Sequence, residues 1–168
     1  ARNGKSSGAW MNEYRTQEKF KDTVTPIVSN NSNFVKGKPG EPVLISWDDA
    51  NTLFHEFGHA LHGLLSNVTY PTLAGTSTKR DFVEFPSQVN EYWLETPEVL
   101  NKFAVHYQTG KPIPKELVER VLKAKNFNQG FETVEYLANA IYDMKIHLAA
   151  TPDKRIDIAE FERQTMAE

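Results

Sequence analysis

The sequence predicts a mainly α-helical fold with a small antiparallel β ribbon beside one central helix. Apolar residues recur at helical spacing after residue 47, most clearly from Phe131 to Leu148. Before residue 47, β-branched and short polar residues are interspersed with Gly and Pro, as in strands and turns. With 39% hydrophobic and 24% charged residues, the 168-residue chain has the composition of one globular domain.

Residues 1–47 are predicted to form an extended and β lead-in. The Gly- and Ser-rich start is a loop that runs into a short extended segment, and Thr23–Val35 is the best strand candidate. Val43–Trp47 is predicted to be either a second short strand or an extended lead into the central helix. The turn residues of Lys36–Pro42 would let these two segments pair as the ribbon.

The central helix is predicted over Trp47–Ser66 and carries the pattern His-Glu-x-x-His, with His55 and His59 four residues apart. At about 100° per residue, both imidazoles stand on one face, one turn apart, where they reach one metal ion. Glu56 lies a third of a turn from His55, where it holds a water beside the metal rather than binding the metal. This is the geometry of a metalloprotease helix.

Four further residues are expected to support this helix and its site. Asp48 or Asp49 would cap the helix start, and either of them, or Asp81, would orient a ligand histidine. Gly58 would allow another backbone to approach closely. The apolar side chains of the helix cover much of its circumference, so we expect it to be buried on more than one side.

Residues 48–95 are predicted to form the zinc-binding helices, and residues 96–168 the supporting helices. The second helix would begin near Lys79 to Asp81 and reach about Glu95, with Pro86 either kinking it or lying in its first turn. Four supporting helices are predicted. The first would begin at Pro97 and end at Gly110, and the second would span Glu116–Lys125. The third would follow a cap at Asn128, and the fourth would span Ile156–Glu168. The aromatic residues after Asn128, Phe131 and Tyr142 among them, are expected in the core.

The composition limits which binding partners and which metal-ligating side chains are plausible. The net charge of −3 gives no reason to expect nucleic acid or an anionic membrane as partner, and no apolar run reaches a transmembrane length. Because the chain has no cysteine, His, Asp and Glu are the plausible metal ligands. The same absence fits a reducing compartment, so we expect a cytoplasmic location.

The third ligand has two candidates. His62 lies seven residues beyond His55, but seven residues rise about 10.5 Å along a helix axis, too far for one tetrahedral zinc to bind all three histidines. Glu84, 25 positions after His59, comes from the second helix, which would bring it to the histidines if the two helices pack side by side. His62 is therefore expected to be a hydrogen-bonded residue of the helix face.

These residues resemble a known family. His55–His59, Gly75-Thr76, Asp81–Gln88 and Asn90–Trp93 are similar to the zinc metallopeptidases that include thimet oligopeptidase, neurolysin and oligopeptidase A. The Glu-Phe-Pro-Ser-Gln form of residues 84–88 is most similar to the Dcp-type peptidyl-dipeptidases, which release dipeptides from free C-termini. The likeness spans nearly the whole chain.

The resemblance implies one zinc ion held by His55, His59 and Glu84, with Glu56 as the general base. It implies a helical, zincin-like core beside a deep channel that admits short unstructured peptides, and a strand near Asn30 to Phe34 that pairs with the substrate backbone. An endo-acting oligopeptidase and a non-catalytic peptide-binding remnant are the alternatives. The retained Glu56 argues against the remnant.

One part of the family pattern has no counterpart here. Members support the reaction with a His and Tyr residues on a downstream Gly- and Tyr-rich loop, and Tyr136, Tyr142 and His147 are not on its motif. Both chain ends look cut, since Ala1 is not an initiator Met and the chain stops within the helix predicted at its end. We therefore interpret 1–168 as a single fragment of a metallopeptidase catalytic domain, weakly active or inactive by itself.

Overall fold

The chain folds into two compact units, which are described separately. The computed structural model describes residues 4–153 and 155–167. The first unit extends to Ile113 and the second begins at Pro114. Most of the regular structure is helical, and the described strands form one two-stranded antiparallel sheet. The predicted fold class is therefore confirmed.

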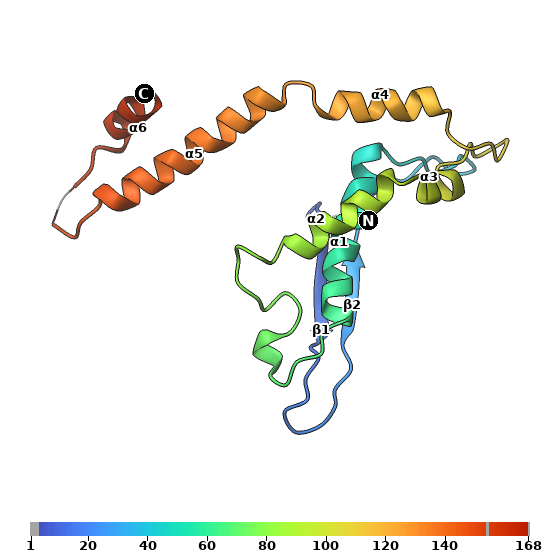
Figure 1. Cartoon of the computed structure of the whole chain (residues 1–168), viewed down its shortest axis with the longest axis horizontal. Coiled ribbons are helices and arrows are strands. Elements are labelled where there is room, and N and C mark those ends of the chain that lie inside the picture. The colour runs from blue at the N-terminus through green and yellow to red at the C-terminus, as the bar shows by residue number, and fades with distance from the viewer. Residues whose placement is uncertain (1–3, 154, 168) are drawn as a thin grey trace. The chain divides into compact units, whose positions relative to one another are not determined.

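The β ribbon pairs β1 (Trp10–Arg15) with β2 (Ile27–Asn31), and Trp10 lies opposite Asn31. Figure 1 shows both strands running alongside the central helix. Of the two forms predicted for Val43–Trp47, the partner strand was wrong, and residues 43–46 instead lead into the helix. The last two residues of this segment are needed at the helix start, because Ser46 caps the helix and Trp47 is its first residue.

Helix α1 (Trp47–Leu64) is the central helix, and its start is fixed by a capping box. The Asp49 backbone N–H donates to Ser46 Oγ at 3.0 Å, and the Ser46 backbone N–H donates to Asp49 Oδ2 at 3.2 Å. The cap is thus Ser46 rather than Asp48 or Asp49, although Asp49 completes the box. Two otherwise unpaired backbone donors are satisfied in this way, which fixes where the helix begins.

Two glycines allow α1 to be covered on two sides, as expected. A Cβ on Gly58 would lie 2.5 Å from the Ser87 Cα, so the backbone of the next helix contacts α1 directly. A Cβ on Gly63 would lie 2.6 Å from Glu13 Oε1 of β1. Close approach at Gly58 brings residues 84–91 against the histidine pair.

The loop after α1 is fixed by the chain that follows β1. The buried Gln17 side chain bonds both backbone groups of Val68, its Nε2 donating to the carbonyl at 3.0 Å and its Oε1 accepting from the N–H at 2.8 Å. The Lys19 N–H donates to the Thr69 carbonyl at 3.1 Å. A short 3₁₀ helix, η1 (Pro71–Leu73), follows.

Helix α2 (Phe85–Glu91) begins later than predicted and continues into the 3₁₀ helix η2 (Tyr92–Glu95). Pro86 lies in the first turn of α2, one of the two predicted positions. An earlier start would set the proline ring against the carbonyl of Phe82, so the residues before it form turns instead. Glu84 consequently occupies the N-cap position of α2 rather than the helix interior.

Helix α3 (Pro97–Phe103) opens at Pro97, as predicted, but ends before Gly110. Val105 and Pro112 form an antiparallel bridge that turns the chain back, and Gly110 lies inside that turn with φ +66°. The side chains of Leu94 and Leu100 are 7% and 4% exposed. They form part of the small apolar core of this unit.

The second unit consists of α4 (Lys115–Lys125), α5 (Gln129–Ala149) and α6 (Ile158–Met166). These helices lie close to their predicted positions, and Asn128 occupies the N-cap position of α5. Tyr142 and Phe161 pack edge to face with ring centroids 5.9 Å apart. The prediction that Phe131 is a core residue was wrong, because the residue is 69% exposed; among the described residues of this unit, α6 is the helix that packs against α5.

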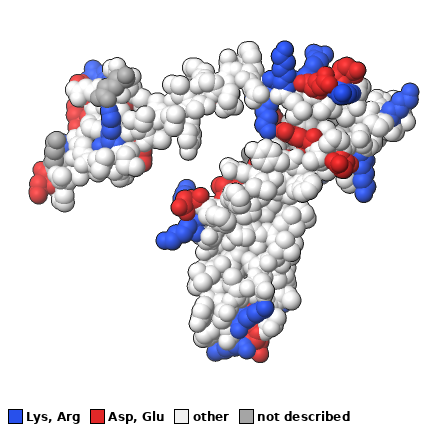
Figure 2. Space-filling model, in the orientation of Figure 1, with Lys and Arg blue, Asp and Glu red and all other residues white. Residues whose placement is uncertain are grey.

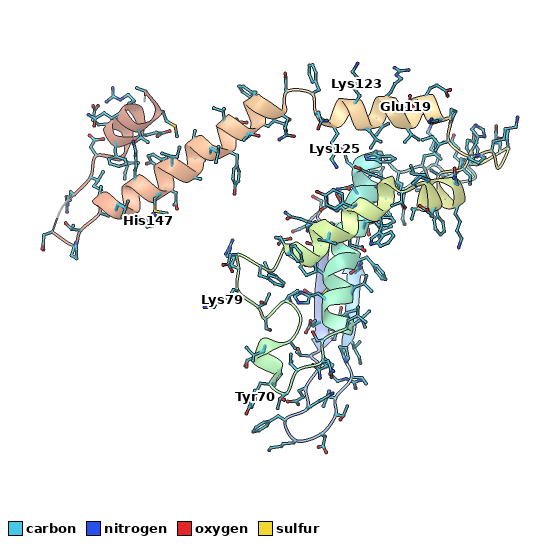
Figure 3. All side chains as sticks on the ribbon, viewed as in Figure 1. Tyr70, Lys79, Glu119, Lys123, Lys125 and His147 are labelled. Atoms are coloured by element: carbon cyan, nitrogen blue, oxygen red, sulfur yellow. The ribbon has the colours of Figure 1, made fainter. Side chains whose placement is uncertain are left out.

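His147 is a helix-surface residue. Figure 3 shows it projecting from α5, where its Nδ1 lies 2.8 Å from the Asp143 carbonyl oxygen one turn earlier.

In the view of Figure 2, the surface over the ribbon and α1 is largely uncharged, with Lys, Arg and acidic side chains near the end of the hairpin. Among the described residues, no helix is both long and apolar enough to cross a membrane.

We expect Gly58→Ala to destabilise the first unit by about 1–3 kcal/mol, the usual cost of overpacking. The added Cβ would lie 2.5 Å from the Ser87 Cα and 2.9 Å from the Asn90 Cβ, so α2 would have to move. The measurement is urea unfolding followed by tryptophan fluorescence, since Trp10, Trp47 and Trp93 all belong to this unit.

Thr52→Ala is the matched control, because Thr52 is an exposed residue of the same helix. Its unfolding free energy should stay within about 0.5 kcal/mol of wild type. Equal stability of the two variants would contradict the close packing of α2 on Gly58.

Candidate metal centre

Three donor atoms from two segments converge beside α1. His55 Nε2 and His59 Nε2 each lie 3.1 Å from Glu84 Oε2. Potential ligand atoms of these three residues all lie within 4.8 Å of one another. The structure therefore brings together the three residues that the sequence predicted as metal ligands.

The spacing of these atoms fits a tetrahedral metal site. A zinc ion bonded at about 2.0–2.1 Å to each donor needs donor atoms about 3.3–3.4 Å apart. The two observed nitrogen-to-oxygen distances are 3.1 Å, a few tenths of an ångström shorter than this spacing, and all three donor atoms lie within 4.8 Å of one another. The side chains of His55 and His59 are 25% and 12% exposed and that of Glu84 is 51% exposed, which leaves one side open to solvent.

Both histidines owe their positions to helix α1. They stand one turn apart, and their rings meet edge to face with centroids 4.9 Å apart. Glu84 is placed by its N-cap position on α2 and by Ser87, a wholly buried residue whose Oγ lies 3.0 Å from Glu84 Oε2. The Ser87 hydroxyl thus supports the Glu84 carboxylate.

A second carboxylate, whose role was not predicted from the sequence, contacts His55 on the side of the ring away from Glu84. Glu91 Oε1 lies 2.6 Å from His55 Nδ1, and Asn51 Nδ2 donates to Glu91 Oε2 at 2.9 Å. The expectation that Asp48, Asp49 or Asp81 orients a ligand histidine was wrong, since Glu91 bonds His55 Nδ1 and His59 Nδ1 has no partner among the described residues. The spacing of two helical turns between Glu84 and Glu91 was the available sequence signal.

Glu56 is half-buried on α1 and is not one of the three grouped ligands. Its backbone is tied to the ribbon by Asn30 of β2. With the amide oriented to face both partners, Asn30 donates to the Glu56 carbonyl at 3.2 Å and accepts from the Phe57 N–H at 3.1 Å. The ribbon thus fixes the helix at the predicted catalytic carboxylate.

His62 lies outside the ligand group, as predicted. The expected hydrogen bond is not seen at its Nδ1, which is buried without a partner among the described residues, as are His59 Nδ1 and Glu13 Oε1. Burial lowers the pKa of His62, and the neighbouring His59 lowers it further, while Glu13 opposes both. The fold therefore favours the neutral imidazole at this position.

The arrangement matches the pattern of HExxH metallopeptidases, which have two imidazoles one helical turn apart, a carboxylate from a following segment and a Glu beside the first His. The model of peptidase family M3 matches residues 1–168, and the chain belongs to this family. The resemblance seen in the sequence is confirmed.

Its relatives include two bacterial peptidase types. The dipeptidyl carboxypeptidase of Salmonella typhimurium is 46% identical over 167 residues, which is 99% of this chain and 24% of the relative. The Escherichia coli dipeptidyl carboxypeptidase is 45% identical, with the same shares covered. Oligopeptidase A of Escherichia coli is 37% identical over 95% of this chain and 24% of the relative. The chain thus spans about a quarter of the length of these relatives.

We expect Glu84→Ala to weaken zinc binding by more than about 100-fold, exceeding the effect usual for residues outside the ligand set. One of three ligands is lost, and the half-exposed position of Glu84 leaves the packing of α1 intact. The measurement is the zinc dissociation constant, by competition with a chromogenic chelator.

Glu98→Gln serves as the control, because Glu98 is an exposed carboxylate in the first turn of α3 and lies outside the ligand group. It should bind zinc as the wild type does. Undiminished zinc affinity in Glu84→Ala would remove Glu84 from the ligand set.

Proposed function

We propose that this chain is the zinc-binding part of a metallopeptidase that releases dipeptides from the free C-termini of short peptides. The observation that carries the proposal is the convergence of His55, His59 and Glu84 beside Glu56. The sequence relation to two dipeptidyl carboxypeptidases supports the reaction type. Because the chain covers a quarter of their length, the activity belongs to a longer polypeptide that contains it.

His55, His59 and Glu84 would hold the zinc ion. Two nitrogens and one oxygen form a ligand set used by catalytic zinc sites, which keep a fourth position open. When bound, zinc supplies Lewis-acid polarisation of a peptide carbonyl and makes water more acidic. The absence of cysteine in the chain fits this choice of ligands.

Glu56 acts as the general base. It follows His55 directly on α1, and its carboxylate can therefore reach a water beside the ligand group. The carboxylate accepts a proton from the attacking water and returns it to the leaving amine. The Asn30 bonds to the helix backbone at residues 56 and 57 hold Glu56 in place during these transfers.

The β ribbon offers a place for an extended substrate. Within the described residues β2 pairs with β1 alone, so one edge of β2 has no strand beside it. A peptide in extended conformation would add there by backbone hydrogen bonds, with little dependence on side chains. This supports short unstructured peptides as the substrate class, and the cysteine-free composition supports a cytoplasmic location.

Product analysis on two peptides of the same sequence tests the reaction type. A full-length polypeptide containing this chain should release the C-terminal dipeptide from the peptide with a free C-terminus and leave the C-terminally amidated peptide uncut. The reason is that dipeptide release requires recognition of the terminal carboxylate. Mass spectrometry of timed samples provides the measurement.

The variant Glu56→Gln tests whether Glu56 is the general base. It should reduce the hydrolysis rate by about 10²- to 10⁴-fold, the usual contribution of general acid–base catalysis, and keep its zinc. Cleavage of the amidated peptide at internal bonds would instead favour the endo-acting alternative. Zinc binding without any hydrolysis by the wild type would favour the peptide-binding alternative.

A further inference from the structure

The His55 ring lies between two carboxylates that come from one short stretch of chain. Its Nε2 is 3.1 Å from Glu84 Oε2, and its Nδ1 is 2.6 Å from Glu91 Oε1. Glu84 and Glu91 are seven residues apart, at the N-cap and the last residue of α2. A separation of two helical turns places both carboxylates on the same side of the helix.

The Glu91 contact determines which ring nitrogen carries the proton. An ionised carboxylate is only an acceptor, so the bond between Nδ1 and Oε1 requires a proton on Nδ1. In a neutral imidazole the lone pair then lies on Nε2, the atom that faces Glu84 and His59. This is the nitrogen that must be unprotonated to bind a metal.

Asn51 holds Glu91 in this orientation. It stands one turn before His55 on α1, and its Nδ2 donates to the second oxygen of Glu91 at 2.9 Å. Both carboxylate oxygens are therefore engaged by α1, one by a ligand and one by an amide. Asn90, the preceding residue, adds a third link from α2 to α1, with its Nδ2 donating to the Phe54 carbonyl at 2.7 Å.

The second histidine lacks an equivalent contact. His59 Nδ1 is buried and has no hydrogen-bond partner among the described residues. Glu91 itself is 28% exposed at the side chain, so its bond to His55 is shielded from solvent over most of its surface. The two ligand histidines are thus held differently, and the carboxylate contact fixes only the first.

We propose that Glu91 is a positioning residue, which holds His55 with its Nε2 lone pair directed at the metal position, and that Asn51 locks Glu91 in that role. The inference rests on the proposed zinc site and adds residues outside its ligand set. Such contacts typically change metal affinity by about 10- to 100-fold.

The test is the zinc dissociation constant of Glu91→Gln, measured by chelator competition. We expect it to rise about 10- to 100-fold. In ¹H–¹⁵N spectra of the zinc-loaded chain, the His55 Nδ1 proton should shift upfield, because a neutral amide oxygen is a weaker acceptor than a carboxylate. Glu98→Gln, an exposed carboxylate of α3, should change neither value.

A double variant separates the charge beside His55 from the link between the helices. In Asn51→Asp with Glu91→Gln, the new amide can accept from His55 and donate to the new carboxylate, so the helix contact persists. We expect the double variant to have the unfolding free energy of the wild type, while its zinc dissociation constant stays above the wild-type value. Recovery of wild-type affinity in the double variant would overturn the positioning role of the Glu91 charge.

The outcomes also separate this inference from the proposed function. If the wild type binds zinc and Glu84→Ala does not, while Glu91→Gln binds as the wild type does, the positioning role is wrong and the metal site stands. If the wild type fails to bind zinc, both are wrong.

Discussion

The direct contact between α1 and α2 at Gly58 is the constraint on which the rest of the site depends. The two helices come so close that a methyl group at Gly58 would overlap the backbone of Ser87. At this separation the N-cap of α2 lies beside the histidine pair, and the Glu84 carboxylate reaches both Nε2 atoms. A side chain at residue 58 would push α2 outward and move Glu84 away from the imidazoles.

The remaining contacts of the first unit fix the position and rotation of these two helices. The capping box of Ser46 and Asp49 sets where α1 begins, and Asn30 ties the ribbon to the helix at Glu56. The Ser87 hydroxyl bonds the Glu84 carboxylate, and the Glu91 carboxylate bonds His55 at Nδ1. The proposed ligands, the proposed general base and their supporting residues thus come from fewer than fifty consecutive residues, apart from the ribbon.

The sequence predicted the helical elements and the histidine pair because these depend on local spacing, while the prediction of Glu84 required in addition that the second helix pack beside the first. His55, Glu56 and His59 follow from one helical turn, and Pro97 and Asn128 mark helix starts that the structure contains. The wrong predictions concern pairings and burial that depend on tertiary contacts. The strand partner of Ile27–Asn31 is β1 rather than residues 43–47, and the partner of His55 is Glu91, 36 positions away, rather than a nearby aspartate. The exposure of Phe131 likewise depends on how few helices surround α5 in its unit.

The most direct test is the location of zinc in crystals of the zinc-loaded chain, found by anomalous scattering at the zinc absorption edge. The account predicts one strong peak at about 2.0–2.1 Å from His55 Nε2, His59 Nε2 and a carboxylate oxygen of Glu84. A peak elsewhere, or Glu84 turned away from a zinc bound to the two histidines, would contradict it.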